Sequence, residues 1–120
     1  MSTHDPFQEF LNKILHDNQP NQNLIDDGLS ALRRLFAIAH EDGGASYVSA
    51  LFLLSLYDPK RFPFQLTDLR MVDRECFEDV LRVLKMDTLA RSHSIEHYFA
   101  RGAKRFEQLA SDWGLIDSSD

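Results

Sequence analysis

Hydrophobic residues recur at helical spacing through residues 67–87, with charged residues between them. Four apolar positions stand at i, i+3, i+4 and i+7, which places them on one face of a helix: Phe77, Val80, Leu81 and Leu84. Asp73 precedes this helix, where an N-cap carboxylate accepts hydrogen bonds from free backbone N–H groups. Thr67 or Asp68 is expected to cap a shorter helix just before it. The pattern therefore predicts two capped helices in succession.

The segment Ala45–Tyr57 is apolar on nearly all sides, which is typical of a helix surrounded by neighbours. A buried strand is the alternative, but thirteen residues rich in Leu and Ala favour a helix. We expect the apolar face of the helix after Asp73 to pack against this central segment.

Two further helices are expected from apolar spacing, one from about Leu24 to His40 and one from about Ser94 to Asp112. Gly28 lies inside the first and costs about 1 kcal/mol of helix propensity relative to Ala. Gly114 follows the second, where a glycine commonly ends a helix. No segment alternates as a half-buried strand does. The predicted fold class is all-α, a compact bundle of five or six helices with an N-terminal amphipathic helical arm.

The arm begins at Asp5 and Pro6, which combine an N-cap residue with a proline at the first helical position. An apolar stripe follows, and its members are the candidate interaction residues: Phe7, Phe10, Leu11, Ile14 and Leu15. The polar stretch 17–23 then offers nothing to bury. We therefore divide the chain into an arm with its linker, residues 1–22, and a single helical domain, residues 23–120.

The apolar stripe of the arm must be covered, because contiguous exposed patches of this kind are rare on soluble monomers. The sequence allows three ways in which the stripe can be buried. The arm folds back on its own core, docks on a second copy of the chain, or meets another protein. Each buried side chain contributes about 1.5–3 kcal/mol before entropy costs, which is enough for any of the three.

The net charge of −6 over 120 residues narrows the possible partners. A single domain is expected at this length. Nucleic-acid binding proteins usually carry a basic surface, because neutralised phosphates supply much of their affinity. The two capped helices suggest a nucleic-acid-associated regulator as an alternative function, but the face it would present carries acidic residues: Glu75, Glu78 and Asp79. The charge therefore disfavours nucleic acid as a direct ligand.

Cys76 is the only cysteine, so the chain forms no intrachain disulfide and no thiolate metal cluster. This fits a reducing compartment, and we expect a buried, unreactive thiol at this position. The N-terminus lacks the features of a signal peptide, and the apolar runs are too short to span a membrane. We therefore expect a cytoplasmic protein without a membrane partner.

Residues 93–97 read His-Ser-Ile-Glu-His, the His-x-x-Glu-His arrangement of inverted zinc peptidases. In such a site, two histidines on one helical face hold zinc and the glutamate acts as general base. A catalytic site also needs a third protein ligand, and Ser94 and Glu96 have ordinary roles at a helix start. His93 and His97 are therefore only weak candidates for a metal site, and a small zinc-dependent hydrolase using Glu96 is a remote alternative. We assign no cofactor and no catalytic residue.

From Ala31 to Trp113 the chain resembles a family of small uncharacterised bacterial proteins, a domain of unknown function often encoded on plasmids and integrative elements. The residues that carry the resemblance are Leu32-Arg33-Arg34-Leu35, Arg61-Phe62-Pro63-Phe64, Thr67-Asp68-Leu69-Arg70, Asp73, Phe77-Glu78-Asp79, Met86-Asp87, His97-Tyr98-Phe99 and Asp112-Trp113. The resemblance implies a compact helical domain of bacterial, cytoplasmic origin. It implies no activity, cofactor or catalytic residue, and the arm lies outside it.

These observations together favour a non-enzymatic protein that acts through protein–protein contacts. The partner is expected to be a second copy, in a homodimer, or an unidentified protein. The arm is the part of the chain that we expect to make the contact.

Overall fold

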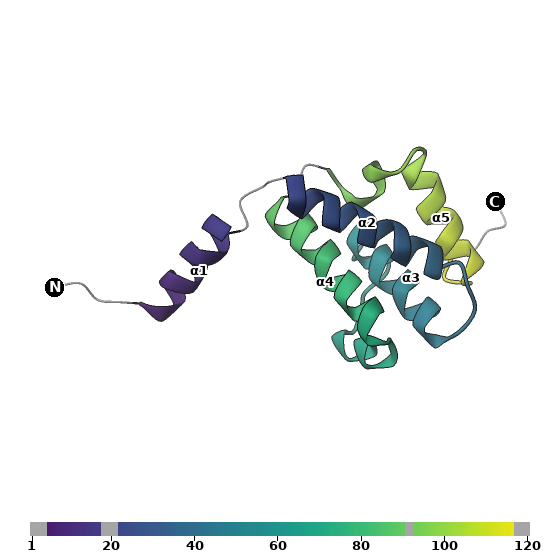
Figure 1. Cartoon of the computed structure of the whole chain (residues 1–120). Helices are drawn as coiled ribbons and strands as arrows, with labels where there is room; N and C mark the ends of the chain where they lie inside the picture. Colours follow the sequence, from purple (N-terminus) through teal and green to yellow (C-terminus); the bar gives the residue numbers. More distant parts are fainter. Residues whose placement is uncertain (1–4, 18–21, 91–92, 117–120) are drawn as a thin grey trace.

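The computed structural model describes residues 5–17, 22–90 and 93–116, without the side chains of residues 12–17. These ranges contain five α-helices, two 3₁₀ helices and no strand, which confirms the all-α class (Figure 1). In chain order, the elements are α1 (Pro6–Asp17), α2 (Gln22–Ile38), α3 (Gly44–Tyr57), η1 (Leu66–Met71), α4 (Arg74–Leu89), η2 (Ile95–Tyr98) and α5 (Gly102–Asp112).

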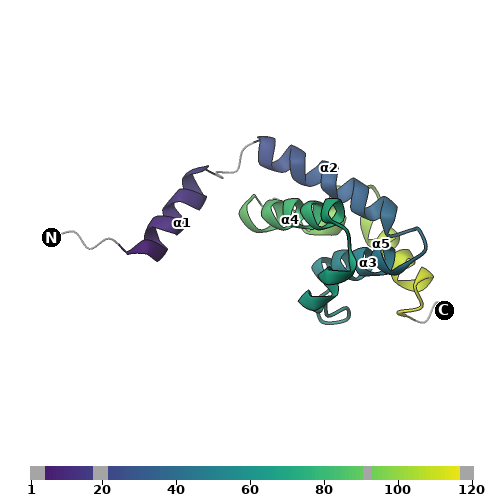
Figure 2. The ribbon, with the colours of Figure 1, turned by 60° about the horizontal axis from the view of Figure 1, so that its bottom comes forward.

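The helical bundle is formed by α2 to α5 with the two short 3₁₀ helices. α4 packs along α2, while α3 contacts α2, α5, η1 and η2 (Figure 2). The expectation that α4 packs mainly on α3 is therefore wrong. α3 is nevertheless the central helix that its all-round apolar sequence predicts, because most of its side chains are buried.

The core is built by α2, α3, α4 and α5, with Ile95 of η2. Phe106 of α5 is fully buried there. Three aromatic rings surround it at centroid distances of 5.3–5.7 Å: those of Phe36, Tyr57 and Phe99. The indole N–H of Trp113 donates a hydrogen bond to the Ala39 carbonyl over 2.8 Å, which ties the end of α5 to the end of α2.

α4 buries a different face from the one predicted. Of the predicted stripe only Val80 is buried, while Phe77 is 38% exposed and Leu81 is 43% exposed. The buried apolar side chains of α4 share Val80 with the predicted stripe and otherwise lie on a neighbouring face with helical spacing: Cys76, Val80, Val83 and Met86. The difference arises because half of the residues of this helix are apolar, so the spacing fits two neighbouring faces.

Local capping chemistry accounts for some of the helix ends. The Asp73 carboxylate accepts a hydrogen bond from the Cys76 backbone N–H over 2.8 Å, which confirms the predicted N-cap of α4. Gly114 has a φ of 70°, and the N–H of Leu115 donates to the Ala110 carbonyl over 2.9 Å, as in a Schellman motif. The predicted cap at Thr67 or Asp68 is wrong, since η1 starts after Gln65 without a side-chain cap.

The predicted helix from Ser94 to Asp112 is interrupted. Arg101 takes a left-handed conformation, with φ 56° and ψ 39°, and separates η2 from α5. Gly102 follows, where an added Cβ would lie 1.6 Å from the carbonyl oxygen of Glu96. Only glycine allows this close approach, so the chain folds back on η2 at this point.

Gly28 sets the distance between α2 and α4. An added Cβ at this position would lie 2.4 Å from the Cβ and 2.6 Å from the Sδ of Met86 on α4. The glycine that weakens the helix propensity of α2 therefore permits a close contact between α2 and α4.

Replacing Asp73 by Ala is expected to lower the free energy of unfolding by about 0.5–2 kcal/mol, because the Cys76 N–H loses its partner. Urea denaturation followed by circular dichroism measures the change. Asp73→Asn is the matched control, since its side-chain oxygen retains the cap. An equal loss in both variants would contradict the capping role.

Replacing Gly28 by Ala is expected to destabilise the protein, although Ala favours a helix by about 1 kcal/mol. The added methyl group meets the Met86 Cβ, which cannot turn away, and overpacking of this kind costs about 1–3 kcal/mol. Thermal unfolding measures the difference. Ser30→Ala, on the exposed side of α2, is the control and should not lower the melting temperature. A higher melting temperature for Gly28→Ala would contradict the close contact.

Candidate interaction surface

The N-terminal helix α1 exposes its aromatic residues. The Asp5 carboxylate accepts a hydrogen bond from the Phe7 N–H over 3.0 Å, which confirms the predicted start of the helix. Phe7 is 65% exposed and Phe10 is 58% exposed, while Leu11 is half-buried. The side chains of Ile14 and Leu15, the other candidate interaction residues, lie outside the described part of the structure.

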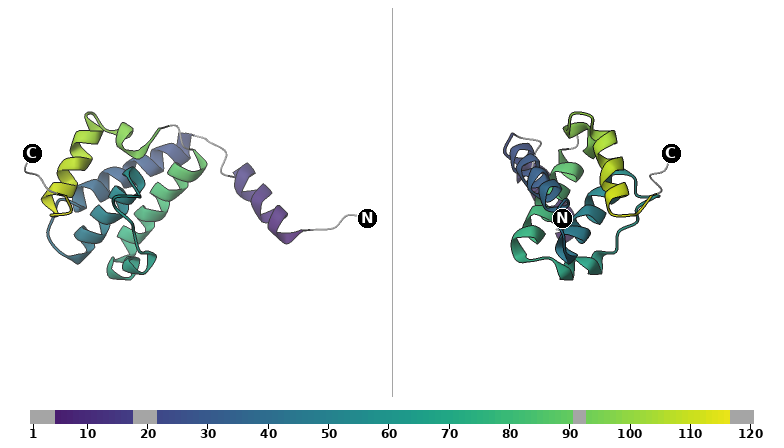
Figure 3. Two further views of the ribbon diagram at one scale, coloured as in Figure 1. Left: turned by 180° about the vertical axis from the view of Figure 1, so that it is seen from behind. Right: turned by 90° about the vertical axis from the view of Figure 1, so that its right-hand side faces the viewer.

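α1 lies beyond the N-terminal end of α2, along the long axis of the bundle (Figure 3). The molecule accordingly measures 65 × 30 × 26 Å along its principal axes. The buried apolar core begins at Leu24 in α2. In the single chain, the two phenylalanine rings of α1 are therefore not covered by the bundle.

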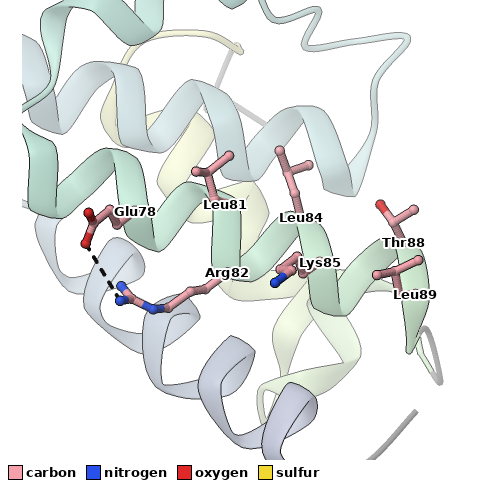
Figure 4. A pocket seen from close by; sticks show the side chains of 7 residues that line it. All are labelled: Glu78, Leu81, Arg82, Leu84, Lys85, Thr88 and Leu89. Carbon is pink, nitrogen blue, oxygen red and sulfur yellow. Dashed lines mark ion pairs between the residues drawn. The ribbon is translucent and has the colours of Figure 1, made fainter. Parts of the chain in front are cut away.

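A second apolar surface lies on α4, on the side turned away from the core. A hollow of about 600 Å³ opens over the C-terminal part of this helix. Its lining residues are Glu78, Leu81, Arg82, Leu84, Lys85, Thr88 and Leu89 (Figure 4). We call these residues, together with Phe77, the outer face of α4. Sequence reasoning missed this surface because it assigned Phe77 and Leu81 to the core, and the wide apolar arc of α4 was the available signal. Leu84, also assigned to the core, is partly buried and packs against it from the edge of this surface.

One charged cluster joins α2 to α4 beside this face. Both carboxylate oxygens of Asp79 accept hydrogen bonds from Arg34 of α2, at 2.8 and 2.9 Å. Arg82 donates a third bond over 2.9 Å. These hydrogen bonds, mainly those from Arg34, hold the pKa of Asp79 below its usual value. Asp79 is only 5% exposed, so it does not belong to an exposed recognition face as the sequence pattern suggested.

A second cluster joins α3 and the following loop to α5. Arg61 donates two hydrogen bonds to the Glu107 carboxylate, at 2.7 and 2.9 Å, and Tyr57 donates a third over 2.5 Å. The bonds from Arg61, and then that from Tyr57, lower the pKa of Glu107 to about 2. Burial and the bond to Glu107 raise the pKa of Tyr57 to about 12. Each donor and acceptor in this cluster is used to hold helices together.

The residues of the His-x-x-Glu-His motif do not form a metal-binding arrangement. They lie at η2, a 3₁₀ helix of four residues, and His93 precedes it. The His93 ring packs against Tyr98, with centroids 5.5 Å apart, while His97 is exposed with Nε2 3.7 Å from a Glu96 carboxylate oxygen. Among the residues described, no three His, Cys, Asp or Glu side chains are grouped closely enough to hold a metal ion.

Cys76 is buried beside α3, as the sequence predicts. Its Sγ lies 3.4 Å from the Ser49 Oγ, and burial raises the pKa of the thiol. A raised pKa reduces the fraction of reactive thiolate, so the position favours packing over chemistry.

The comparison with protein families shows to which family the helical bundle belongs. A model described as a family of unknown function, DUF7673, matches residues 29–114. The chain belongs to this family. The DUF7673 match extends from within α2 to the end of α5, so it includes the outer face of α4 and leaves α1 outside. The resemblance over Ala31 to Trp113 is thereby confirmed, whereas the bacterial and mobile-element origin stays a prediction.

No curated protein and no solved structure matches the chain. Within the described ranges, the helices are too short or too polar to cross a membrane.

Replacing Glu107 by Gln is expected to remove a pH-dependent part of the stability. The folded-state pKa of Glu107 is lowered from 4.5 to about 2, so its ionised form stabilises the fold above about pH 4.5 and this contribution is lost as the pH falls towards 2. The melting temperature of Glu107→Gln should therefore lie below that of the wild type at pH 7 and approach it near pH 2.

Arg61→Gln is the companion variant. It leaves Glu107 in place and removes its Arg61 partner, which is the main cause of the lowered pKa of Glu107. Circular dichroism melts at several pH values measure both variants. A gap between wild type and Glu107→Gln that stays constant from pH 7 to pH 2 would contradict the assignment.

Proposed function

We propose that this DUF7673 protein is a non-enzymatic interaction module that associates with a second copy of itself through the apolar face of α1. The exposure of Phe7 and Phe10, at 65% and 58%, carries the proposal. The two rings lie three residues apart, so they share one face of the helix. Two neighbouring exposed phenylalanines are a strong reason to expect an interaction surface, because soluble proteins rarely leave such patches uncovered.

A second copy of the chain is a suitable partner on energetic grounds. Burying each phenylalanine side chain contributes about 1.5–3 kcal/mol before entropy costs. A two-fold dimer uses the same contact twice, so the contributions of both copies act on one association step. An unidentified protein is the alternative partner, and the oligomeric state distinguishes the two.

The charged clusters support a non-enzymatic function. In one, Asp79 is held by Arg34 and Arg82, and in the other, Glu107 is held by Arg61 and Tyr57. Their hydrogen bonds join helices that are distant in sequence, which is a structural use of these groups. The buried thiol of Cys76, with its raised pKa, fits the same interpretation and a reducing cytoplasm.

The alternative of a nucleic-acid-associated regulator receives less support. Asp79, on the helix that would enter a groove, is engaged by two arginines, and α4 is packed along α2. The net charge of −6 also opposes the approach of phosphates. The remote alternative, a zinc-dependent hydrolase, requires His93 and His97 on one helical face, and η2 does not provide it.

The double variant Phe7→Glu/Phe10→Glu is expected to convert a dimer into a monomer, because each new carboxylate would have to be desolvated at the contact. Size-exclusion chromatography with light scattering should show about half of the wild-type mass. The matched control is Leu66→Glu on η1, where the native side chain is 74% exposed, and its mass should equal that of the wild type.

Circular dichroism establishes that both variants retain the helical fold. A wild type that is monomeric at high concentration, or a double variant that keeps the dimer mass, would contradict self-association through α1.

A further inference from the structure

We propose that α1 of one copy docks on the outer face of α4 in a second copy, so that two chains exchange their N-terminal helices. This inference rests on the proposed function, because it assumes self-association through α1. It adds the receiving surface and the way in which the two chains are joined.

The outer face of α4 has the residue spacing of a helix-binding seam. Its apolar members Phe77, Leu81 and Leu84 recur at intervals of four and three residues, as in helices that pack side by side, and Thr88 continues the same line four residues later. Phe77 is 38% exposed and Leu81 is 43% exposed. In Figure 4, Leu81 and Leu84 point to the same side of the helix. The seam is therefore available to another helix.

The dimensions of α1 match this seam. At 1.5 Å per residue, positions 77 to 88 extend over about 16 Å, and the apolar positions 7 to 15 of α1 extend over about 12 Å. The hollow of about 600 Å³ lies over the C-terminal part of the seam and is lined mainly by apolar side-chain surface. A short helix with large apolar side chains on one face is the kind of occupant that this surface suits.

The charges of the two surfaces are opposite in sign. Residues 5–17 contain three acids and one base, which gives a charge of −2. The outer face of α4 carries Glu78, Arg82 and Lys85, which gives +1. Opposite charges favour the encounter of α1 with α4 over the pairing of two acidic α1 helices.

The connection between α1 and α2 favours exchange over docking within one chain. Met86 packs against α2, and Phe77 lies nine residues away, about 180° around the helix at 3.6 residues per turn. A helix on the seam is thus separated from α2 by two interhelical spacings of about 8–10 Å each. α1 ends at Asp17 and α2 begins at Gln22, so the connection spans at most about 18 Å and would have to be almost fully extended for α1 to dock on its own α4. A second copy has no such restriction.

The two rings alone bring a reciprocal exchange to the lower end of the size range of specific interfaces. A phenylalanine buries about 150–250 Å² when fully covered, and Phe7 and Phe10 are 65% and 58% exposed. With an equal area lost from the opposing α4, the two rings of one α1 then remove about 370–620 Å² at each docking site. Two sites give about 700–1,200 Å², to which the other apolar positions of α1 add, and specific protein–protein interfaces start at about 1,200 Å².

The experiment uses full-length chains with one altered surface each: Phe10→Glu changes α1 and Leu81→Glu changes the outer face of α4. Each variant alone is expected to be monomeric by light scattering. When the two are mixed, the unaltered α1 of the Leu81→Glu chain meets the unaltered α4 of the Phe10→Glu chain. One docking site is restored, so native mass spectrometry should detect a heterodimer at concentrations well above the wild-type dissociation constant.

The matched control mixes Leu66→Glu with the wild type, and both homodimers and the heterodimer should form. Circular dichroism verifies that each variant is folded, and Phe77→Glu, at an exposed position of the same seam, replaces Leu81→Glu if the latter is not. A dimeric Leu81→Glu variant would overturn the docking site while leaving self-association through α1 intact. Monomeric variants that form no heterodimer would overturn the exchange. A monomeric wild type would overturn the proposed function as well.

Discussion

The close approach of α2 and α4 at Gly28 and Met86 determines the geometry of the bundle. Gly28 contributes no side chain at this point, and the Met86 side chain packs directly on the α2 backbone, since a Cβ on Gly28 would lie 2.4 Å from that of Met86. About two turns further along the pair, the short spacing brings the Arg34 guanidinium into bidentate contact with Asp79. The two contacts fix the register of an antiparallel pair and the rotation of α4 about its own axis. That rotation decides which apolar residues of α4 enter the core and which face solvent.

Features that depend on a few neighbouring residues could be predicted from the sequence. The caps at Asp5 and Asp73, the stop at Gly114 and the buried central helix α3 are of this kind, because each follows from local hydrogen bonding or from composition. The break before α5 could not be predicted in the same way. Arg101 adopts its left-handed conformation because the chain must turn where Gly102 meets the Glu96 carbonyl, and that contact exists only in the folded protein.

Of the two candidate surfaces, one could be predicted from the sequence and the other could not. The apolar face of α1 is evident from the spacing of Phe7 and Phe10, because the sequence before α2 contains no other apolar segment to confuse it. The outer face of α4 could not be separated from the core-facing side by spacing alone. Apolar residues occupy both, and only the contact with α2 determines that Val83 and Met86 are buried while Leu81 is exposed. The charge of Asp79 gave a misleading signal for a related reason, since its partner Arg34 lies 45 residues away.

The position of α1 outside both the buried core and the matched family region has an evolutionary consequence. Substitutions in α1 leave the packing of residues 22–116 unchanged, because the buried apolar residues begin at Leu24. Effects at distant, independent sites add rather than interfere. The contact that we propose for α1 could therefore be strengthened, weakened or removed without a cost in folding. Assembly and fold would then be inherited as separate traits.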